Sequence, residues 1–141
     1  MSLDVESIGL GVRIPIWSRE GTLDAWNRFA AVDGVFAGHH MDDEIGRQEG
    51  FAAAFMSAPN AQAYLHSMLR TWLDGSGRIV NVDIRLKKPF LRGRTLHSGG
   101  EVAAIRPEGH ELFVDLTIWQ VDDEGAQVGV GVATVAVQVS K

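Results

Sequence analysis

Residues 57–75 read SAPNAQAYLHSMLRTWLDG, and this stretch decides the fold because it has the pattern of one long helix with an apolar face. Its apolar side chains recur at spacings of three and four residues, which places them on a common helix face. They are Ala61, Tyr64, Leu65, Met68, Leu69, Trp72 and Leu73. Pro59 suits the first turn of a helix and Gly75 suits its end. We therefore predict a long and mostly buried helix.

Strand-like sequence follows this helix to the end of the chain. Between residues 80 and 87, apolar and polar side chains alternate, which is typical of a strand with one covered face. Three more strand-like runs follow, at residues 96–105, 111–121 and 127–139. Turn-forming residues separate these runs at 107–109 and 122–125. Such consecutive strands form an antiparallel sheet, and we expect the helix to cover its inner face.

The first part of the chain is predicted to add a strand and a short helix. Residues 8–17 have the pattern of a strand interrupted at Pro15, and Thr22 is placed to cap a helix through Trp26 and Phe29. Helices first and strands second, with no linker between them, is the order of an α+β protein. With 141 residues, we expect one domain over residues 1–141.

Charge and composition exclude several classes of function. A net charge of −5 opposes nucleic-acid binding, which requires a positive surface. The absence of cysteine excludes disulfides, thiol nucleophiles and thiolate zinc sites, and suits a reducing compartment. No apolar run approaches the roughly 18 residues of a membrane helix, and the N-terminus lacks a signal-peptide pattern. We expect a cytoplasmic protein without nucleic-acid or membrane partners.

The pair His39 and His40, ahead of the long helix, is the segment best suited to chemistry. Without cysteine, imidazole and carboxylate groups are the side chains there that transfer protons near neutral pH. Capping a helix or bridging surface carboxylates is the alternative role. A metal site is not expected, since adjacent histidines point in different directions and no further ligand motif is present. Asp42, Asp43 and Glu44 have the pattern of a solvated first helical turn.

Several short motifs stand at characteristic separations along the chain. They are Phe29-Ala30, His40-Met41-Asp42, Gly46, Gly50-Phe51, the helix start Ser57-Ala58-Pro59, and VDIRLKKPFLRG at residues 82–93. At these separations they resemble the MaoC-like hydratases of the hotdog superfamily, over nearly the full length of the chain. The resemblance implies an α+β hotdog fold, in which a curved antiparallel sheet encloses one central helix.

The sequence departs from this family at the catalytic carboxylate. The family's catalytic aspartate falls on Val35, whereas its histidine is retained as His40. Asp33 lies two residues upstream of the expected position, and Asp42 and Asp43 lie shortly after the histidine. These three carboxylates are the candidates to complete the site.

The resemblance implies hydration or dehydration of an enoyl thioester. His40 is then expected to handle the proton of the water, with Asp33 as the replacement carboxylate. The main-chain N–H of Ala58, at the positive end of the long helix, is expected to stabilise the enolate oxygen. Further substrate-binding candidates are Asp42, Ser57 and His66. For His66, a hydrogen-bonded histidine in the helical core is the alternative.

Five of the 13 basic residues lie within ten positions of this acidic chain. They are Arg85, Lys87, Lys88, Arg92 and Arg94. A cluster of this kind is suited to the phosphates of coenzyme A, or to an acidic acyl carrier protein. An edge strand protected from aggregation by its charges is the alternative.

Two further functions stay open beside the hydratase. One is thioester hydrolysis, and the other is a catalytically silent, acyl-binding subunit of a heteromeric hydratase. No cofactor is expected apart from the carrier of the thioester, and no metal. A homodimer, or a higher or mixed hotdog oligomer, is expected because the sheet leaves an edge to pair.

Overall fold

The computed structural model describes residues 3–139, and the long helix predicted from the sequence lies at its centre. This helix, α3 (Ala58–Leu73), begins after Ser57, whose hydroxyl oxygen accepts a hydrogen bond from the N–H of Asn60. It ends at Asp74, which adopts a left-handed conformation with φ of 47°. The predicted helix is confirmed, with Pro59 in its first turn as expected.

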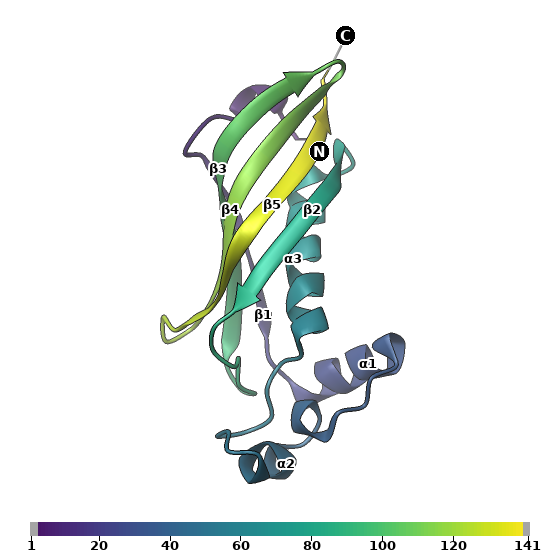
Figure 1. The fold of residues 1–141 in the computed structure, drawn as a ribbon, viewed down its shortest axis with the longest axis vertical. Helices are drawn as coiled ribbons and strands as arrows, with labels where there is room; N and C mark the ends of the chain where they lie inside the picture. Colours follow the sequence, from purple (N-terminus) through teal and green to yellow (C-terminus); the bar gives the residue numbers. More distant parts are fainter. Residues whose placement is uncertain (1–2, 140–141) are drawn as a thin grey trace.

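One sheet of five antiparallel strands curves along α3 in the order β1-β3-β4-β5-β2 (Figure 1). The strands are β1 (Arg13–Glu20), β2 (Gly77–Leu86), β3 (Thr95–Glu108), β4 (Glu111–Asp122) and β5 (Gln127–Gln138). Consecutive strands β3, β4 and β5 are neighbours, while β1 and β2 form the two edges. This is the predicted architecture of a sheet along one central helix.

The opening strand differs from the prediction at both of its ends. It begins at Arg13 instead of residue 8, because Val5–Ser7 forms a 3-10 turn and Gly11 has a positive φ of 79°. It continues to Glu20 because the backbone stays paired with β3. Its register with β3 shifts on either side of Pro15, where the sequence predicts an interruption.

The turn predicted at residues 107–109 is shorter than expected. Pro107 and Glu108 belong to β3 and pair with β4, so that only Gly109 and His110 connect the two strands. The partner strand β1 reaches no further along β3 than Glu101. Pro107 therefore lies on an edge, where its missing N–H removes no bond of the sheet.

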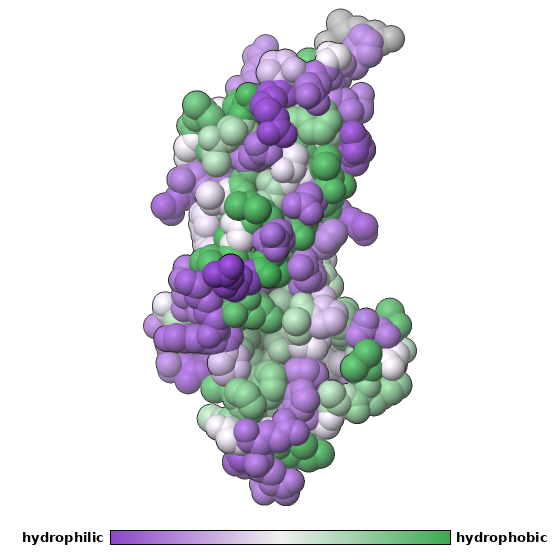
Figure 2. Space-filling model, viewed as in Figure 1, coloured by the Kyte–Doolittle hydropathy of each residue, from purple (hydrophilic) through white to green (hydrophobic). Residues whose placement is uncertain are grey.

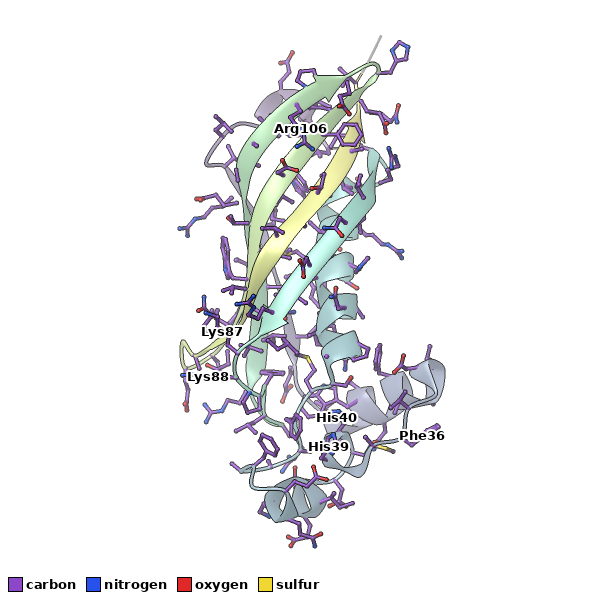
Figure 3. The ribbon with its side chains drawn as sticks, in the orientation of Figure 1. Phe36, His39, His40, Lys87, Lys88 and Arg106 are labelled. Carbon is purple, nitrogen blue, oxygen red and sulfur yellow. The ribbon has the colours of Figure 1, made fainter. Side chains whose placement is uncertain are left out.

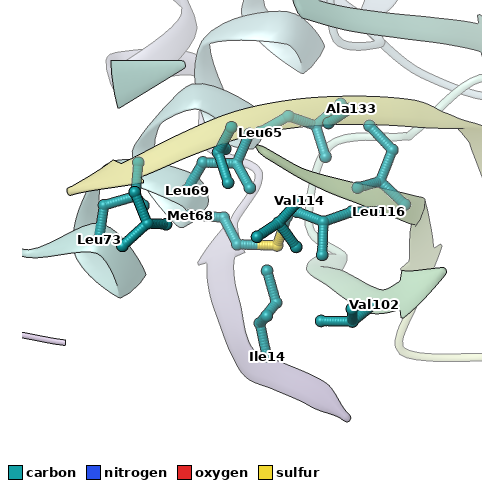
Figure 4. Close-up of a cluster of buried hydrophobic side chains, with 12 residues drawn as sticks. Ile14, Leu65, Met68, Leu69, Leu73, Val102, Val114, Leu116 and Ala133 are labelled. Carbon is teal, nitrogen blue, oxygen red and sulfur yellow. The ribbon is translucent and has the colours of Figure 1, made fainter. Parts of the chain in front are cut away.

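The main core lies between α3 and the sheet (Figure 4). The helix contributes Leu65, Met68, Leu69 and Leu73, and the sheet contributes Ile14, Val102, Val114, Leu116, Ile118, Ala133, Val135 and Val137. Each of these side chains is at most 2% exposed. Replacement of a leucine in such a position by alanine costs about 2–5 kcal/mol.

A second apolar cluster joins α1 (Leu23–Asp33) to the end of the sheet near the start of α3. Its largest members are Trp26 and Phe90, whose rings meet edge to face with centroids 6.0 Å apart. Helix α1 and the short helix α2 (Asp43–Gln48) lie beyond the first turn of α3 (Figure 1). Within residues 3–139, no helix is both long and apolar enough to cross a membrane.

Candidate active site

The surface is hollowed between the end of the sheet and the helical segment that carries α1 and α2 (Figure 2). A cavity of about 460 Å³ lies here, within the range of small-molecule sites. Its lining includes His39, His40, Phe55, Ala58, Lys87 and Lys88. In Figure 3 the two histidines lie below the first turn of α3, and the two lysines follow the end of β2.

The ring of His40 is held by the segment that leads into α3. Its Nδ1–H donates to the carbonyl oxygen of Phe55 at 2.8 Å, and the N–H of Phe55 donates to the carbonyl oxygen of His39 at 3.1 Å. A carbonyl oxygen only accepts, so the hydrogen of the neutral His40 ring is on Nδ1. The basic nitrogen of this ring is therefore Nε2.

The ring of His39 meets that of His40 instead of pointing away from it. The two Nε2 atoms are 3.1 Å apart, and the ring centroids are 4.1 Å apart. On its other side, Nδ1 of His39 lies 2.8 Å from a carboxylate oxygen of Glu49. The expectation that these adjacent histidines diverge is wrong, because the 3-10 turn Gly38–His40 brings both rings against Phe55.

The surroundings of His40 favour its neutral form. Burial is the largest influence and lowers the pKa of this imidazole below 6.5, and the nearby His39 lowers it further. The carbonyl of Phe55 and the charge of Glu49 act in the opposite direction but do not reverse the shift. At neutral pH, His40 is therefore able to accept a proton.

Asp42 and Asp43 hold the backbone around this site. Asp42 caps α2, and its carboxylate accepts from the N–H groups of Glu44 and Ile45, as expected for a first helical turn. Asp43 accepts from the N–H of Ala54 at 3.0 Å. Neither carboxylate lines the cavity with His40, so the expectation that Asp42 contacts the substrate is not supported.

Asp43 also pairs with Arg92, whose Nε lies 2.7 Å from the carboxylate. The hydrogen bond from Arg92 is the main reason why the pKa of Asp43 is lowered, followed by the N–H of Ala54. The pair connects α2 to the segment before β3, where the N–H of Arg92 also donates to the carbonyl oxygen of Ala54. Arg92 therefore has a structural partner in this chain.

Glycine is required where α2 meets the chain ahead of α3. A Cβ atom on the buried Gly46 would lie 2.3 Å from the carbonyl oxygen of Ala53. Any side chain at this position would therefore separate α2 from residues 53 and 54. Gly46, one of the residues that carries the resemblance to the MaoC-like family, acts here through close backbone packing.

A smaller cavity of about 80 Å³ lies on the other side of His40. Asp33, Val35 and Ser57 are among its lining residues, and its volume has room for ordered water. Asp33 is the last residue of α1 and shares this cavity with His40, but within residues 3–139 no hydrogen bond joins them. Of the proposed carboxylates, Asp33 is the one that lines a cavity together with His40.

The main-chain N–H of Ala58 remains available in the first turn of α3. The N–H of Asn60 is bound by the hydroxyl oxygen of Ser57 and that of Ala61 by its carbonyl oxygen, while Pro59 has none. The N–H of Ala58 has no acceptor among the described residues. Because Ala58 lines the cavity with His40, a donor and a base share one wall.

The basic cluster is divided by the fold. Lys87 and Lys88 line the main cavity, and within residues 3–139 neither ammonium group is paired with a carboxylate. Arg85 lines a separate hollow of about 300 Å³ with Lys87 and residues of β5. Arg92 is paired with Asp43, as described above, and Arg94 with Glu124.

His66 lies away from the candidate site. It lines a different cavity with Arg70, near the end of α3 and the beginning of β2. The expectation that His66 faces the same cavity as His40 is therefore wrong.

Comparison with solved structures identifies the class of this fold, whereas comparison with sequences does not. No protein-family model matches the chain, and no curated protein sequence matches it. Solved structures match it closely in shape. A MaoC-like dehydratase from Rhodospirillum rubrum has a TM-score of 0.83 at 21% identity, with 99% of each chain covered.

Two other similar structures extend the comparison. An (R)-hydratase from A. caviae involved in PHA biosynthesis has a TM-score of 0.84 at 19% identity, covering 96% of this chain and all of its own. The ChsH1-ChsH2 complex from Mycobacterium tuberculosis gives a TM-score of 0.83 at 16% identity, over 92% of this chain and 98% of that chain. The chain therefore has the α+β hotdog fold of the MaoC-like dehydratases, as the sequence resemblance implies.

Two members of the site have no signal in the sequence. Of the histidine pair, the resemblance selects only His40 as a catalytic residue, and no motif includes Glu49. Their contact depends on how α2 folds back, and a separation of ten residues marks no regular element. Only the packing of residues 38–55 brings them together.

Proposed function

We propose that this protein hydrates or dehydrates an acyl thioester of the 2-enoyl class. The observation that carries the proposal is the wall formed by His40 and Ala58. It presents a neutral imidazole, fixed by Phe55, and an unpaired main-chain N–H to one cavity. The similarity in fold to an (R)-hydratase and to a MaoC-like dehydratase agrees with this assignment.

The chemistry follows from what these groups donate and accept. In hydration, the oxygen of water bonds to C3 of the enoyl group, the C2=C3 π electrons shift toward the thioester oxygen, and the water loses a proton to Nε2 of His40. His40 then returns this proton to C2, where it forms the new C–H bond. The N–H of Ala58 binds the thioester oxygen, on which negative charge develops. Acid–base catalysis of this type contributes about 10²–10⁴-fold to the rate, and one oxyanion donor about 10²–10³-fold.

The carrier of the acyl group is proposed to be coenzyme A or an acyl carrier protein. Lys87 and Lys88 line the cavity, have no carboxylate partner within residues 3–139, and supply positive charge in a chain whose net charge is −5. Phosphate groups or an acidic carrier surface match this local reversal of sign. The adjacent hollow adds the cation of Arg85 beside Lys87, together with the carboxylate of Asp83.

We further propose that the protein works as a dimer or as part of a mixed oligomer. Strand β2 is an edge of the sheet, with unpaired backbone groups that a second hotdog chain is able to engage. One of the similar structures is the ChsH1-ChsH2 complex.

The test is incubation of the purified protein with crotonyl-CoA and longer enoyl-CoA thioesters. Loss of the enoyl absorbance without release of free thiol is the expected result. Release of free thiol would instead identify a thioesterase. No change in either signal would contradict catalysis by this chain alone. Recovery of turnover on addition of a copurifying hotdog chain would then identify a silent subunit. This role is favoured because no carboxylate within residues 3–139 is bonded to His40.

A further inference from the structure

Four groups form a continuous line of polar contacts at the edge of the cavity. A carboxylate oxygen of Glu49 lies 2.8 Å from Nδ1 of His39, and Nε2 of His39 lies 3.1 Å from Nε2 of His40. The line ends where Nδ1 of His40 meets the carbonyl oxygen of Phe55 at 2.8 Å. The two imidazoles therefore contact each other through their Nε2 atoms. Each Nδ1 atom faces an acceptor, Glu49 for His39 and the carbonyl of Phe55 for His40.

The proton count along this line depends on which nitrogens of the two rings donate. The carbonyl of Phe55 accepts only, and so does the ionised carboxylate of Glu49, so that both Nδ1 atoms carry hydrogen. A neutral imidazole has one N–H, which would leave two bare lone pairs facing each other at 3.1 Å. A hydrogen bond between them requires a third proton, shared by the two Nε2 atoms.

We propose that His39 and His40 act as one acid–base unit sharing this proton, and that Glu49 is the positioning residue that retains it. The catalytic part of this inference rests on the proposed hydration of an enoyl thioester. Glu49 then supplies, through His39, the negative charge that the MaoC-like family carries at the position of Val35. Its carboxylate acts on the charge of the pair and does not touch the substrate.

A shared proton allows the histidine pair to donate one proton and to accept another within one catalytic cycle. In hydration, the oxygen of water bonds to C3 and the C2=C3 π bond breaks. The electron pair of this π bond then forms a C–H bond between C2 and the shared proton. The water then loses one proton to the vacated Nε2 pair. Water has been added across the double bond, and the pair ends with the proton count with which it began.

The groups around the pair favour a single shared charge. Glu49 at the end of α2 and Asp33 at the end of α1 bring negative charge, while Lys87 and Lys88 after β2 bring positive charge into the same cavity. The first turn of α3 contributes no titratable side chain. The mutual influence of the two imidazoles and their partial burial oppose a second additional proton, in agreement with the lowered pKa of His40.

The test is a pH titration of the histidine ring signals by NMR, in the full-length wild type and in Glu49→Gln. In the wild type, the signals of His39 and His40 should move together in two coupled steps. Glutamine still accepts from Nδ1 of His39 but carries no charge, so uptake of the shared proton should shift to lower pH by about one unit. Glu44→Gln is the matched control, since Glu44 lies on α2 and pairs with Arg47.

A second variant removes the proton acceptor but keeps the packing. In His39→Phe, the ring can still stack on Phe55, as the His39 ring does with planes 5° apart. His40 should then titrate in one step. If the wild type has enoyl-CoA turnover, the pH–rate profile should lose its alkaline limb in His39→Phe and have that limb displaced to lower pH in Glu49→Gln.

The outcomes separate this inference from the proposed function. Independent titration of His39 and His40, unchanged in Glu49→Gln, would overturn the shared proton even in an active hydratase. Coupled titration in a protein that is inactive on enoyl thioesters would retain the shared proton and overturn its catalytic use. An effect of Glu44→Gln equal to that of Glu49→Gln would also overturn the assignment, because it would reflect overall charge.

Discussion

Nδ1 of His40 donates to the carbonyl oxygen of Phe55 at 2.8 Å, and this bond decides which nitrogen of the ring is available as a base. The bond also ties the ring to Phe55, three residues before the first residue of α3. An asparagine at position 40 can preserve the donor to Phe55 while removing Nε2. The bond and the base can therefore be tested separately.

We predict that His40→Asn lowers kcat for enoyl-CoA hydration by about 10²–10⁴-fold with little loss of thermal stability. The loss follows from removal of the base, because the amide nitrogen can still donate to Phe55. Steady-state kinetics and thermal unfolding measure the two effects. His110→Asn, in the exposed turn between β3 and β4, is the control and should match the wild type. Wild-type turnover in His40→Asn would reject His40 as the base.

The proposed oxyanion donor, the main-chain N–H of Ala58, can be removed by one substitution that leaves the other side chains of the site unchanged. Ala58→Pro deletes the N–H at the first position of α3, where proline is well accepted and where the preceding Ser57 is already extended with ψ of 154°. We expect kcat to fall by about 10²–10³-fold with α3 intact, as measured by kinetics and circular dichroism. Ala58→Ser retains the N–H and should keep most of the activity. Equal activity in both variants would exclude the main-chain N–H of Ala58 as the oxyanion donor.

The positive rim predicts a difference between binding and turnover. If the carrier binds as proposed, Lys87→Gln combined with Lys88→Gln should raise KM for an enoyl-CoA at low salt with kcat nearly unchanged, because the proposed role of both lysines is to bind the carrier and not the reacting carbons. The effect should disappear with a thioester of N-acetylcysteamine, which has no phosphate. Arg106→Gln, at the far end of the sheet (Figure 3), is the control for the loss of one cation and is compared with each of the single variants Lys87→Gln and Lys88→Gln. A KM that is unchanged for the coenzyme A thioester would show that the lysines do not bind the carrier.

The pair between Asp43 and Arg92 predicts a pH-dependent contribution to stability. The pKa of Asp43 is lowered in the folded protein, so the stabilisation is complete above its ordinary value of 3.8 and is lost as the pH falls through the lower folded value. Asp43→Asn should lower the melting temperature by a few degrees at pH 6, and the deficit should shrink below pH 3.8. Asp24→Asn, in an exposed pair with Arg28, should have little effect. A deficit that stays constant at low pH would contradict the ionic origin.

Much of the fold was predictable because its signals are local. Spacing along residues 57–75 identified α3, and alternation identified the strands, since each pattern depends on neighbours within one element. The ends of the strands were harder to predict, because they depend on backbone pairing with a neighbouring strand. Pro107 remained in β3 because the adjoining strand stops short of it, which is a property of the sheet and not of the proline.

The sequence by itself determined the α+β order, the helix start that exposes the N–H of Ala58, and the histidine that precedes it. Tertiary structure alone decided which charges reach that histidine. It turned Asp43 toward Arg92, placed His66 in another cavity, and brought Glu49 against His39. Local periodicity is set by bonded geometry within a few residues, whereas a contact between side chains of separate segments depends on how closely their backbones pack.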